Sequence, residues 1–506
     1  MTSLRKTMLF TAALAVLPAA EGWSQTLQEA LAAAYSNNPS LLAARAAVRV
    51  VDENVPQALA GWRPTVVIAG AAGYSDTTAR VPATVPVQRD VFGNVVNPGT
   101  AGQPFALFTD SPRNTGSLQA TVSQPIYRGG RTTASTRRAE NQVYAQRARL
   151  LAAEQQVLLE SVRNYVLVVQ NQEEVRLNTN NVEVLNRQLQ ATNERFRVGE
   201  ITRTDVAQAE ARLALARYQL EQAQGNLQSA RAIFLRWIGL EPARVVAPPP
   251  VVSPVRSQQD AVRVATDNNP AVVAAMFDEA AARDFIDVQF AALLPQVTVN
   301  ASAFRLDNQN TRGTRQTGAQ VTANLNVPLY QGGAEHAAVR QARQQAQQAR
   351  QAVSDARRIA AQDSTRAWEA LVTARAQVES SRAQIRAQEI ALDGVQREAI
   401  VGSRTTLDVL NAEQELLNAR VNLVRALATL ITASYELPST LGRLTARDLG
   451  LPVQLYDPSA YYNTVRDRWV GTGDFSEAAT QAPQGAVTVQ TLPPATPAQA
   501  PARRTP

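Results

Sequence analysis

Apolar and polar residues alternate one by one in several short segments of the chain. Three segments alternate over seven to nine residues and a fourth is rich in small and β-branched residues; they cover 118–126, 297–303, 321–329 and 65–74. In one of them, Val297, Val299 and Ala301 alternate with Thr298 and Asn300. Strands with one apolar and one polar face are typical of membrane barrels, and also of half-buried strands in soluble sheets. Four such segments, with no other sheet to join, favour the barrel.

The rest of the chain follows a helical pattern. Two proline-free runs of helix-forming residues with heptad-like apolar spacing, 131–195 and 334–397, each predict a helix about 100 Å long. Second helical runs are expected at 205–238 and 407–435, and shorter helices before the strands at 40–62 and 271–294. Gly199 and Gly402 separate the long runs from the second runs. Each half of the chain therefore contains a long helical hairpin that turns at Gly199 or Gly402.

The order of these elements occurs twice. Asn38-Pro39 returns as Asn269-Pro270, 231 residues later, whereas Gly402 follows Gly199 by 203 residues. The two spacings differ because one stretch of the first half is longer. A repeat of about 200 residues is too long for the unit of a solenoid. The chain is therefore interpreted as a duplicated half-protein.

Four prolines mark the predicted junctions between strands and helices: Pro64, Pro125, Pro295 and Pro328. Pro64 and Pro295 have the longer spacing, and Pro125 and Pro328 the shorter one, so the first half has 28 additional residues between Pro64 and Pro125. The stretch 76–113 contains five prolines and several glycines. We expect it to form an exposed extracellular loop.

Composition divides the chain into six parts. Residues 1–24 have a basic start, an apolar run and small residues before the expected cut after Ser24, which predicts a signal peptide for export. The first structural repeat covers 25–239, a proline-rich linker 240–258 and the second repeat 259–442; an equatorial segment around the middle of the helices covers 443–474, and a tail 475–506. The tail is rich in Pro, Ala, Thr and Gln without a period, which predicts a disordered periplasmic segment.

The composition excludes several classes of protein. The chain has no cysteine and a single histidine, His336, so thiolate chemistry, a histidine-ligated metal and a Ser-His relay are not expected. Apolar residues make up 45% but aromatic residues only 5%, which suits closely packed helices better than a thick globular core. We expect no enzyme activity, no catalytic residue, no cofactor and no metal site. Export also excludes nucleic acid as a partner.

Four strands per chain are too few for a membrane barrel. A barrel in a membrane has no open edge, and the smallest have eight strands. Two copies would give about eight strands with a filled interior, and three about twelve with room for a lumen. Helices of about 100 Å extend far beyond a hydrocarbon layer of about 30 Å. They are predicted to form a tube in the periplasm.

Three motifs in this order resemble the TolC family of outer-membrane channels. They are Asn-Asn-Pro near the mature N-terminus, Pro-Leu-Tyr-Gln-Gly-Gly at 328–333 and Val-Gly-Ser-Arg-Thr-Thr-Leu-Asp-Val-Leu at 401–410. The resemblance covers roughly residues 25–450. It implies a homotrimer in the outer membrane, with a 12-stranded barrel continued by a coiled-coil α-helical tunnel in the periplasm. It also implies two partners, a periplasmic membrane-fusion adaptor and an inner-membrane pump of ABC or RND type, beside the surrounding lipid.

The resemblance further implies a gate at the periplasmic tips of the hairpins. Thr204 and Asp205 match the first tip, Arg404 matches an arginine that pairs with it, and Asp408 matches an aspartate that lines the pore. The second aspartate of the pore is replaced by Asn411, which implies a weaker anionic constriction.

A further departure and one alternative bear on this gate. Ala399 stands where the best-known family members have a gate tyrosine, which implies that one gate bond is missing. The alternative is that Thr204, Asp205, Thr406 and Asp408 cap the helices that follow the glycine breaks. Both roles can coexist.

The expected function is a passive export channel, gated at its periplasmic end, for type I protein secretion or drug efflux. The alternative is a periplasmic coiled-coil adaptor or structural protein of an export complex. Adaptors of that class have one helical hairpin, an inner-membrane anchor or lipid, and compact β modules. Two hairpins and four amphipathic strands favour the channel.

Overall fold

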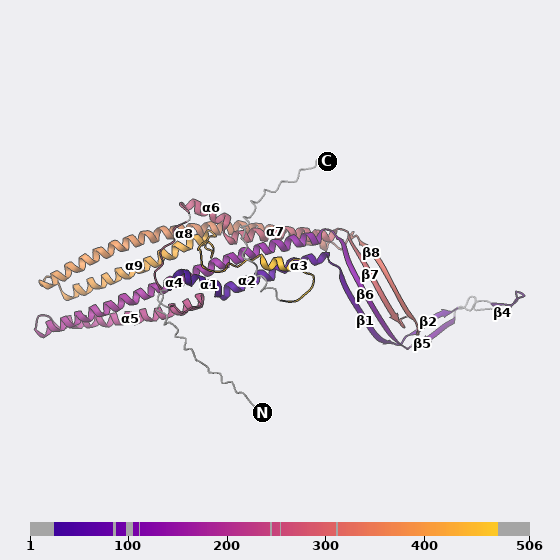
Figure 1. Ribbon diagram of the computed structural model, residues 1–506, viewed down its shortest axis with the longest axis horizontal. Coiled ribbons are helices and arrows are strands. Elements are labelled where there is room, and N and C mark those ends of the chain that lie inside the picture. Colours follow the sequence, from indigo (N-terminus) through magenta and orange to yellow (C-terminus); the bar gives the residue numbers. More distant parts are fainter. Residues whose placement is uncertain are drawn as a thin grey trace, which may run out of the picture.

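The computed structural model describes residues 25–473, apart from 84–87, 98–104, 111, 243–244, 254 and 310–311. The predicted signal peptide, 1–24, and the predicted tail, 475–506, lie outside the described residues. Figure 1 shows an elongated molecule, with long helices at one end, a sheet beside them and a narrow β-hairpin beyond the sheet.

Four antiparallel strands form one sheet in the order β1-β6-β7-β8. These strands are β1 (Thr65–Ser75), β6 (Arg113–Arg128), β7 (Gln296–Asp307) and β8 (Arg315–Asn326). Each repeat contributes one pair of strands, and β6 and β7 join the two pairs in the middle of the sheet. Within the described residues, β1 pairs only with β6 and β8 only with β7. The sheet therefore has two unpaired edges.

The register gives this sheet one apolar and one polar face. Residues directly opposite each other in an antiparallel pair lie on the same face. Val66, Val122, Ala301 and Val321 are aligned across the four strands on one face, and their neighbours Val67, Thr121, Ser302 and Gln320 are aligned on the other. Val66 and Val321 are 67% and 75% exposed. The apolar face is thus the one suited to lipid, as the alternating pattern predicts.

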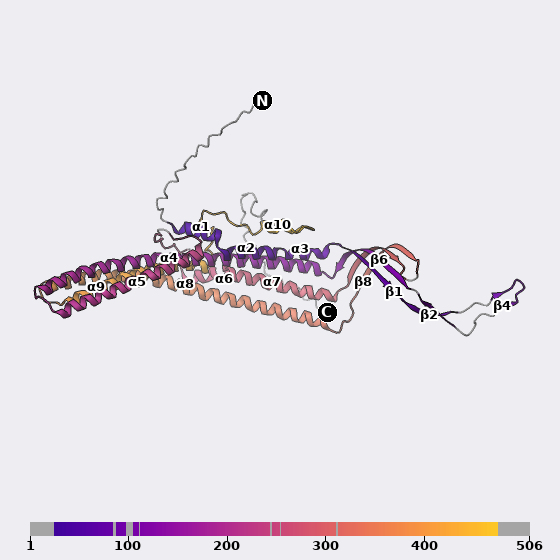
Figure 2. The same ribbon diagram turned by 90° about the horizontal axis from the view of Figure 1, so that it is seen from below.

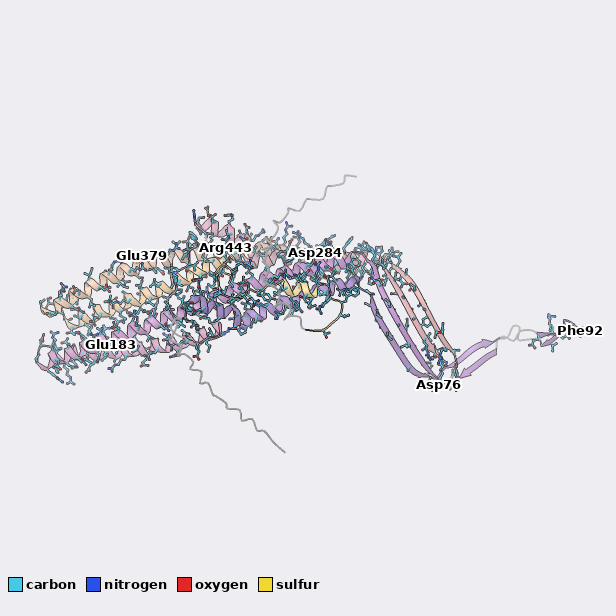
Figure 3. All side chains as sticks on the ribbon, viewed as in Figure 1. Asp76, Phe92, Glu183, Asp284, Glu379 and Arg443 are labelled. Carbon is cyan, nitrogen blue, oxygen red and sulfur yellow. The ribbon has the colours of Figure 1, made fainter. Side chains whose placement is uncertain are left out.

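The connection between β1 and β6, which was expected to form an exposed extracellular loop, contains further strands. β2 (Thr78–Ala83) pairs with β5 (Phe105–Asp110), and β3 (Gln88–Arg89) pairs with β4 (Val95–Asn97). At the end of this hairpin, a carboxylate oxygen of Asp90 accepts hydrogen bonds from the backbone N–H groups of Phe92 (2.9 Å) and Asn94 (2.8 Å). Phe92 lies far from the helices (Figure 3). That the hairpin faces the cell exterior stays a prediction.

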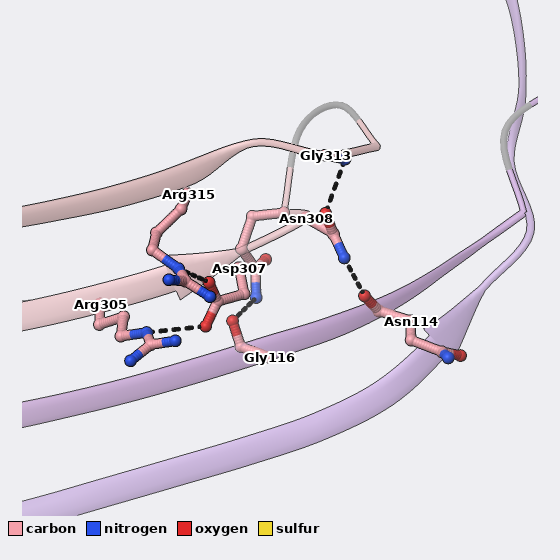
Figure 4. A network of polar contacts seen from close by, with 8 residues as sticks. Asn114, Gly116, Arg305, Asp307, Asn308, Gly313 and Arg315 are labelled. Carbon is pink, nitrogen blue, oxygen red and sulfur yellow. Dashed lines mark hydrogen bonds and ion pairs between the residues drawn. The ribbon is translucent and has the colours of Figure 1, made fainter.

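The second repeat connects its strands by a much shorter turn. There Asp307 accepts hydrogen bonds from Arg305 (2.9 Å) and Arg315 (2.6 Å). The next residue, Asn308, has a φ of 57°, accepts a hydrogen bond from the N–H of Gly313 (2.8 Å) and donates its side-chain amide to the carbonyl of Asn114 (2.9 Å) (Figure 4). This network ties the turn to β6 of the first repeat.

Helices make up most of the described chain. The first repeat contains α1 (Leu27–Asn37), α2 (Pro39–Asp52), α3 (Asn54–Leu59), the 3₁₀ turn η1 (Ala60–Trp62), α4 (Arg131–Arg197) and α5 (Arg203–Ile238). The second contains α6 (Gln258–Asn268), α7 (Pro270–Phe290), the 3₁₀ turn η2 (Ala291–Leu293), α8 (Ala334–Ile400) and α9 (Thr406–Thr440), and α10 (Ala460–Val465) follows. Asn38 and Asn269 cap the helices that begin at Pro39 and Pro270, as expected of proline at a first helical position.

Helices and strands follow the same lateral order. Of the helices next to the sheet, α2 packs on α4, α4 on α7 and α7 on α8 (Figure 2). Along the chain α2 leads through α3 and η1 to β1, β6 leads to α4, α7 leads through η2 to β7, and β8 leads to α8. The order β1-β6-β7-β8 is therefore continued as α2-α4-α7-α8, and farther from the sheet α5 and α9 pack against α4 and α8. Neighbours in the sheet stay neighbours in the helical layer.

The main hydrophobic core lies at the waist of the helices. Tyr165 of α4 and Phe234 of α5 are both fully buried there, with ring centroids 6.2 Å apart. The Tyr165 hydroxyl is 2.7 Å from the carbonyl of Gln25 and 2.8 Å from that of Val246. Residues of the equatorial segment, among them Leu444 and Leu451, belong to the same core. Several distant segments of the chain are thus held against α4.

Of the described helices, α9 is the one that is long enough and apolar enough to cross a membrane, judged by its length and composition. That is weak evidence, because core helices of soluble proteins satisfy the same criteria. α9 packs against α8 and α4, and its Leu437 is fully buried in a core cluster. We therefore interpret α9 as a core helix of the bundle.

The four predicted junction prolines occupy three kinds of position. Pro64 and Pro295 directly precede β1 and β7, and Pro328 follows β8 by two residues. Pro125 lies inside β6, where a bulge shifts the register between Pro125 and Tyr127. Its assignment as a junction was wrong, because β7 continues beside it and β6 bulges to accommodate a residue without an N–H donor.

Candidate gate at the hairpin tips

Both helical hairpins turn through the same backbone motif. After α4, the N–H of Gly199 donates to the carbonyl of Phe196 and the N–H of Glu200 to that of Arg195, both at 2.9 Å. The corresponding two bonds form after α8 around Gly402, and each glycine has a φ of 80°. This is the Schellman motif, whose left-handed residue is usually glycine because other side chains are strained there. Both breaks expected from sequence are therefore helix ends with a defined turn.

Each following helix begins with a capping box. The Asp205 carboxylate accepts from the hydroxyl (2.7 Å) and the N–H (3.0 Å) of Thr202. Asp408 accepts from the hydroxyl (2.8 Å) and the N–H (3.0 Å) of Thr405. The Thr202 hydroxyl holds the pKa of Asp205 below its usual range, and the Thr405 N–H and hydroxyl do the same for Asp408. The capping bonds thus favour the charged form of both carboxylates.

The capping residues are not all those expected. Asp205 and Asp408 take part in capping, but the N-caps are Thr202 and Thr405. Thr204 lies at the second position of α5 and Thr406 at the first of α9. A threonine three residues before an aspartate forms the box, whereas a threonine inside the first turn does not. Thr204 is exposed, so its side chain is accessible to another hairpin.

Each tip also contains an ion pair within its own hairpin. Arg404 lies 2.9 Å from Glu398 of α8, and Arg195 of α4 lies 2.6 Å from Glu200. All four side chains are about half-exposed. In a single chain, the partner of Arg404 is therefore Glu398. A bond from Arg404 to Asp205 of another subunit stays a prediction.

Asn411 links the two hairpins, and sequence reasoning missed its partner. The Arg212 guanidinium of α5 donates to the Asn411 side-chain oxygen of α9 at 2.7 Å. Beside this bond, Leu410 packs in a buried cluster with Leu213 and Leu185 of the other hairpin. Arg212 lies two helical turns after Asp205 and hence on the same face of α5. That spacing could have identified Arg212 as a residue near the candidate gate. Its bond to α9, however, depends on how the two hairpins pack together.

The chain matches known channel proteins along most of its length. The sequence profile of the family described as outer membrane efflux protein matches residues 30–239 and 261–443. The outer membrane efflux protein BepC of Brucella suis is 34% identical over 458 residues, which cover 90% of this chain and 94% of BepC. The outer membrane protein TolC of Vibrio cholerae is 25% identical over 69% of this chain and 82% of its own length.

Solved structures agree with this assignment at the level of the fold. The crystal structure of the outer membrane protein VceC of Vibrio cholerae covers 82% of this chain and 96% of its own, with a TM-score of 0.68 and 19% identity. The expected resemblance to TolC-like channels is confirmed, and the alternative of a periplasmic adaptor is wrong. The chain belongs to the outer membrane efflux protein family: it is an export channel of the outer membrane whose helices form the periplasmic part, and it is not an enzyme.

Proposed function

We propose that three copies of this chain form one export channel, a 12-stranded barrel continued by a helical tunnel. The sheet carries this proposal, since it has an apolar and a polar face and two unpaired edges. An open sheet edge is not stable in lipid, because its N–H and C=O groups lack partners. Three copies close the ring with about twelve strands, and their polar faces then surround a lumen wide enough for cargo.

The channel acts with a periplasmic membrane-fusion adaptor and an inner-membrane pump of ABC or RND type. The exposed hairpin tips are the part of the chain farthest from the sheet (Figure 1), and hence the part nearest to an inner-membrane complex. The name of BepC indicates efflux, and we extend that activity to this chain. Deletion of the gene should sensitise cells to toxic compounds, and the intact gene should restore resistance.

The tips hold the resting channel closed. Thr204 and Asp205 of one hairpin lie at the same end of the molecule as Arg404 of the other. In a ring of subunits, an Arg404 side chain that leaves Glu398 can reach the Asp205 carboxylate of a neighbour. Three copies of such a bond favour the closed state, and an adaptor that binds the open tips better reverses the balance.

Two substitutions of opposite expected effect test this gate. Arg404→Ala removes the bond between subunits and should raise the open fraction of single channels in planar bilayers. Glu398→Gln releases Arg404 from its own hairpin and should lower that fraction. Arg176→Ala is a matched control, since Arg176 also pairs with a glutamate of its own helix, Glu173 at 2.8 Å, but away from the tips.

The test has a clear negative outcome. If Arg404→Ala and Glu398→Gln both leave conductance unchanged and both lower helix content, the pair stabilises the hairpin and is no gate. Asp408→Ala gives an independent measurement. It removes a ring of negative charge and should weaken block by multivalent cations. Since Asn411 is uncharged, this block should already be weaker than in relatives with aspartate at that position.

A further inference from the structure

We propose the register in which the unpaired edge of β8 joins β1 of a second copy of this chain. The inference deepens the proposed trimer and rests on it. It is drawn from the internal repeat: β6 and β8 correspond at a spacing of 203 residues, and β1 and β7 at a spacing of 231. The β6–β7 pair inside one chain is therefore the template for the β8–β1 pair between two chains.

The first observation is that β8 ends early. β6 is 16 residues long and reaches Arg128, whereas β8 is 12 residues long and ends at Asn326. The last part of β6 is paired with β7, but the corresponding residues 327–331, which follow β8, are irregular. Two of them, Leu329 and Tyr330, are 91% and 81% exposed. The segment that pairs with a neighbouring strand in the first repeat therefore has, among the described residues, no neighbouring strand at the corresponding position of the second repeat.

The register follows when each residue of the β6–β7 pair is matched to its counterpart in the other repeat. Tyr127 is opposite Val297, which places Tyr330 opposite Val66 of the neighbour. Gln124 is opposite Val299, which places Val327 opposite Ile68.

The same matching of counterparts applies near the end of the sheet that is farthest from the helices. Leu118 is opposite Arg305, which places Val321 opposite Tyr74 of the neighbour. Between the two ends, the β6 bulge at Ile126 transfers to Leu329, so Pro328 again precedes the unpaired residue of a bulge.

The faces of the sheet provide an independent check. Val66, Ile68 and Tyr74 lie on the apolar face through their alignment with β6, and Val321 lies there through β7. All the proposed pairs therefore join residues of the apolar face. A slip of one residue would place lipid-facing side chains of one strand beside lumen-facing ones of the other. The counterparts were matched by sequence spacing alone, without regard to which face of the sheet they lie on. That the matched residues share the apolar face therefore supports the register.

The same correspondence extends into the helices below. Arg137 of α4 forms ion pairs with Asp284 (3.6 Å) and Asp287 (3.0 Å) of α7. The counterparts of Arg137 and Asp284 are Arg340 of α8 and Glu53, which directly follows α2. A basic and an acidic residue thus recur where α8 of one copy is proposed to pack on α2 of the next, whereas the counterpart of Asp287 is Pro56, so one of the two ion pairs can recur. Glu53 also accepts a hydrogen bond from the Tyr461 hydroxyl at 2.8 Å, which holds it at this position.

Paired cysteines test the register, because the chain has none of its own. Directly opposite residues of antiparallel strands have Cα atoms about 4.5–5.5 Å apart, within the range of a disulfide. The double variant with Tyr330→Cys and Val66→Cys should form covalent trimers on a denaturing, non-reducing gel. The matched control combines Tyr330→Cys with Ile68→Cys, a slip of two residues on the same face. We expect at least five-fold less covalent trimer from the control. A second pair, Val321→Cys with Tyr74→Cys, tests the upper part of the sheet.

The outcomes separate the register from the proposed assembly. Equal or stronger cross-linking of the control would overturn the register, and so would the absence of cross-links in both predicted pairs when light scattering still shows trimers. If light scattering of the cysteine-free protein shows no trimer, the proposed function itself fails. Cross-linking of both predicted pairs, with little from the control, confirms the register from bottom to top.

Discussion

The helices α4 and α8 are counterparts of equal length in the two repeats, yet their surroundings differ. Each has 67 residues, but 23 of them are buried in α4 and nine in α8. α4 lies in the middle of the helical layer between α2 and α7, whereas α8 lies at its edge. Similar patterns of sequence thus lead to different burial because of position. The exposed flank of α8 is the one that the proposed assembly covers.

The largest expected effect comes from paired substitutions in these two helices. Tyr165 of α4 and Trp368 of α8 are counterparts; Tyr165 is fully buried, whereas Trp368 is only partly buried. Tyr165→Ala should lower the free energy of unfolding by about 3–5 kcal/mol, since it leaves a cavity and removes the hydrogen bonds of the hydroxyl to the backbone of Gln25 and Val246. Trp368→Ala should cost distinctly less. Denaturant unfolding followed by circular dichroism measures both, and equal losses would contradict the difference in packing.

The next effect concerns a buried charge beside α4. Asp52 is fully buried and, among the described residues, neither of its carboxylate oxygens has a hydrogen-bond partner. Burial raises its pKa from 3.8 to about 6, although Arg147 opposes the shift. The counterpart of Asp52 in the second repeat is Arg283, which is largely exposed and pairs with Glu279 at 2.5 Å. Only the first repeat therefore contains this source of pH dependence.

The sign follows from the raised pKa. Above pH 6 the folded protein holds a charged, buried carboxylate, and below about pH 4 the group is protonated in both the folded and unfolded states. Stability should therefore rise as the pH falls from 7 to 4, by at most about 3 kcal/mol from this group. Asp52→Asn should stabilise the protein at pH 7 and flatten its pH profile, which thermal unfolding at several pH values measures. An unchanged profile would show that water or Arg147 already compensates the charge.

The smallest expected effect concerns the hairpin tips, where the two repeats should respond alike to the loss of a helix cap. Thr202 and Thr405 form the same capping box at the two tips. Replacement of either by alanine should cost about 1 kcal/mol of helix stability. Hydrogen exchange of the first turns of α5 and α9 should increase to a similar extent in the two variants. Thr204→Ala and Thr406→Ala are controls of the same size, and a larger effect from either control would reverse the capping assignment.

The sequence predicted the elements that depend on local pattern. The hairpin turns at Gly199 and Gly402, the long helices and the four strands of the sheet all follow from periodicity and glycine or proline signals. Features that depend on contact between distant segments were missed. Pro125 was expected at a junction because its strand partner was unknown. The pairing of β2 with β5, inside the connection that was expected to form an exposed loop, was not predicted. The hydrogen bond from Arg212 to Asn411 joins one hairpin to the other, so the sequence around either residue does not predict it.

The length of α4 and α8 has a mechanical consequence. Each is one uninterrupted helix from the glycine pair beyond the sheet to the tip, a lever of about 100 Å. A sideways displacement of about 10 Å at the tip then needs a tilt of only about 6°, within the gentle curvature that long helices tolerate. Each residue of the lever changes its backbone angles by a fraction of a degree. Large movements at the periplasmic end therefore leave the strands in the membrane almost unmoved.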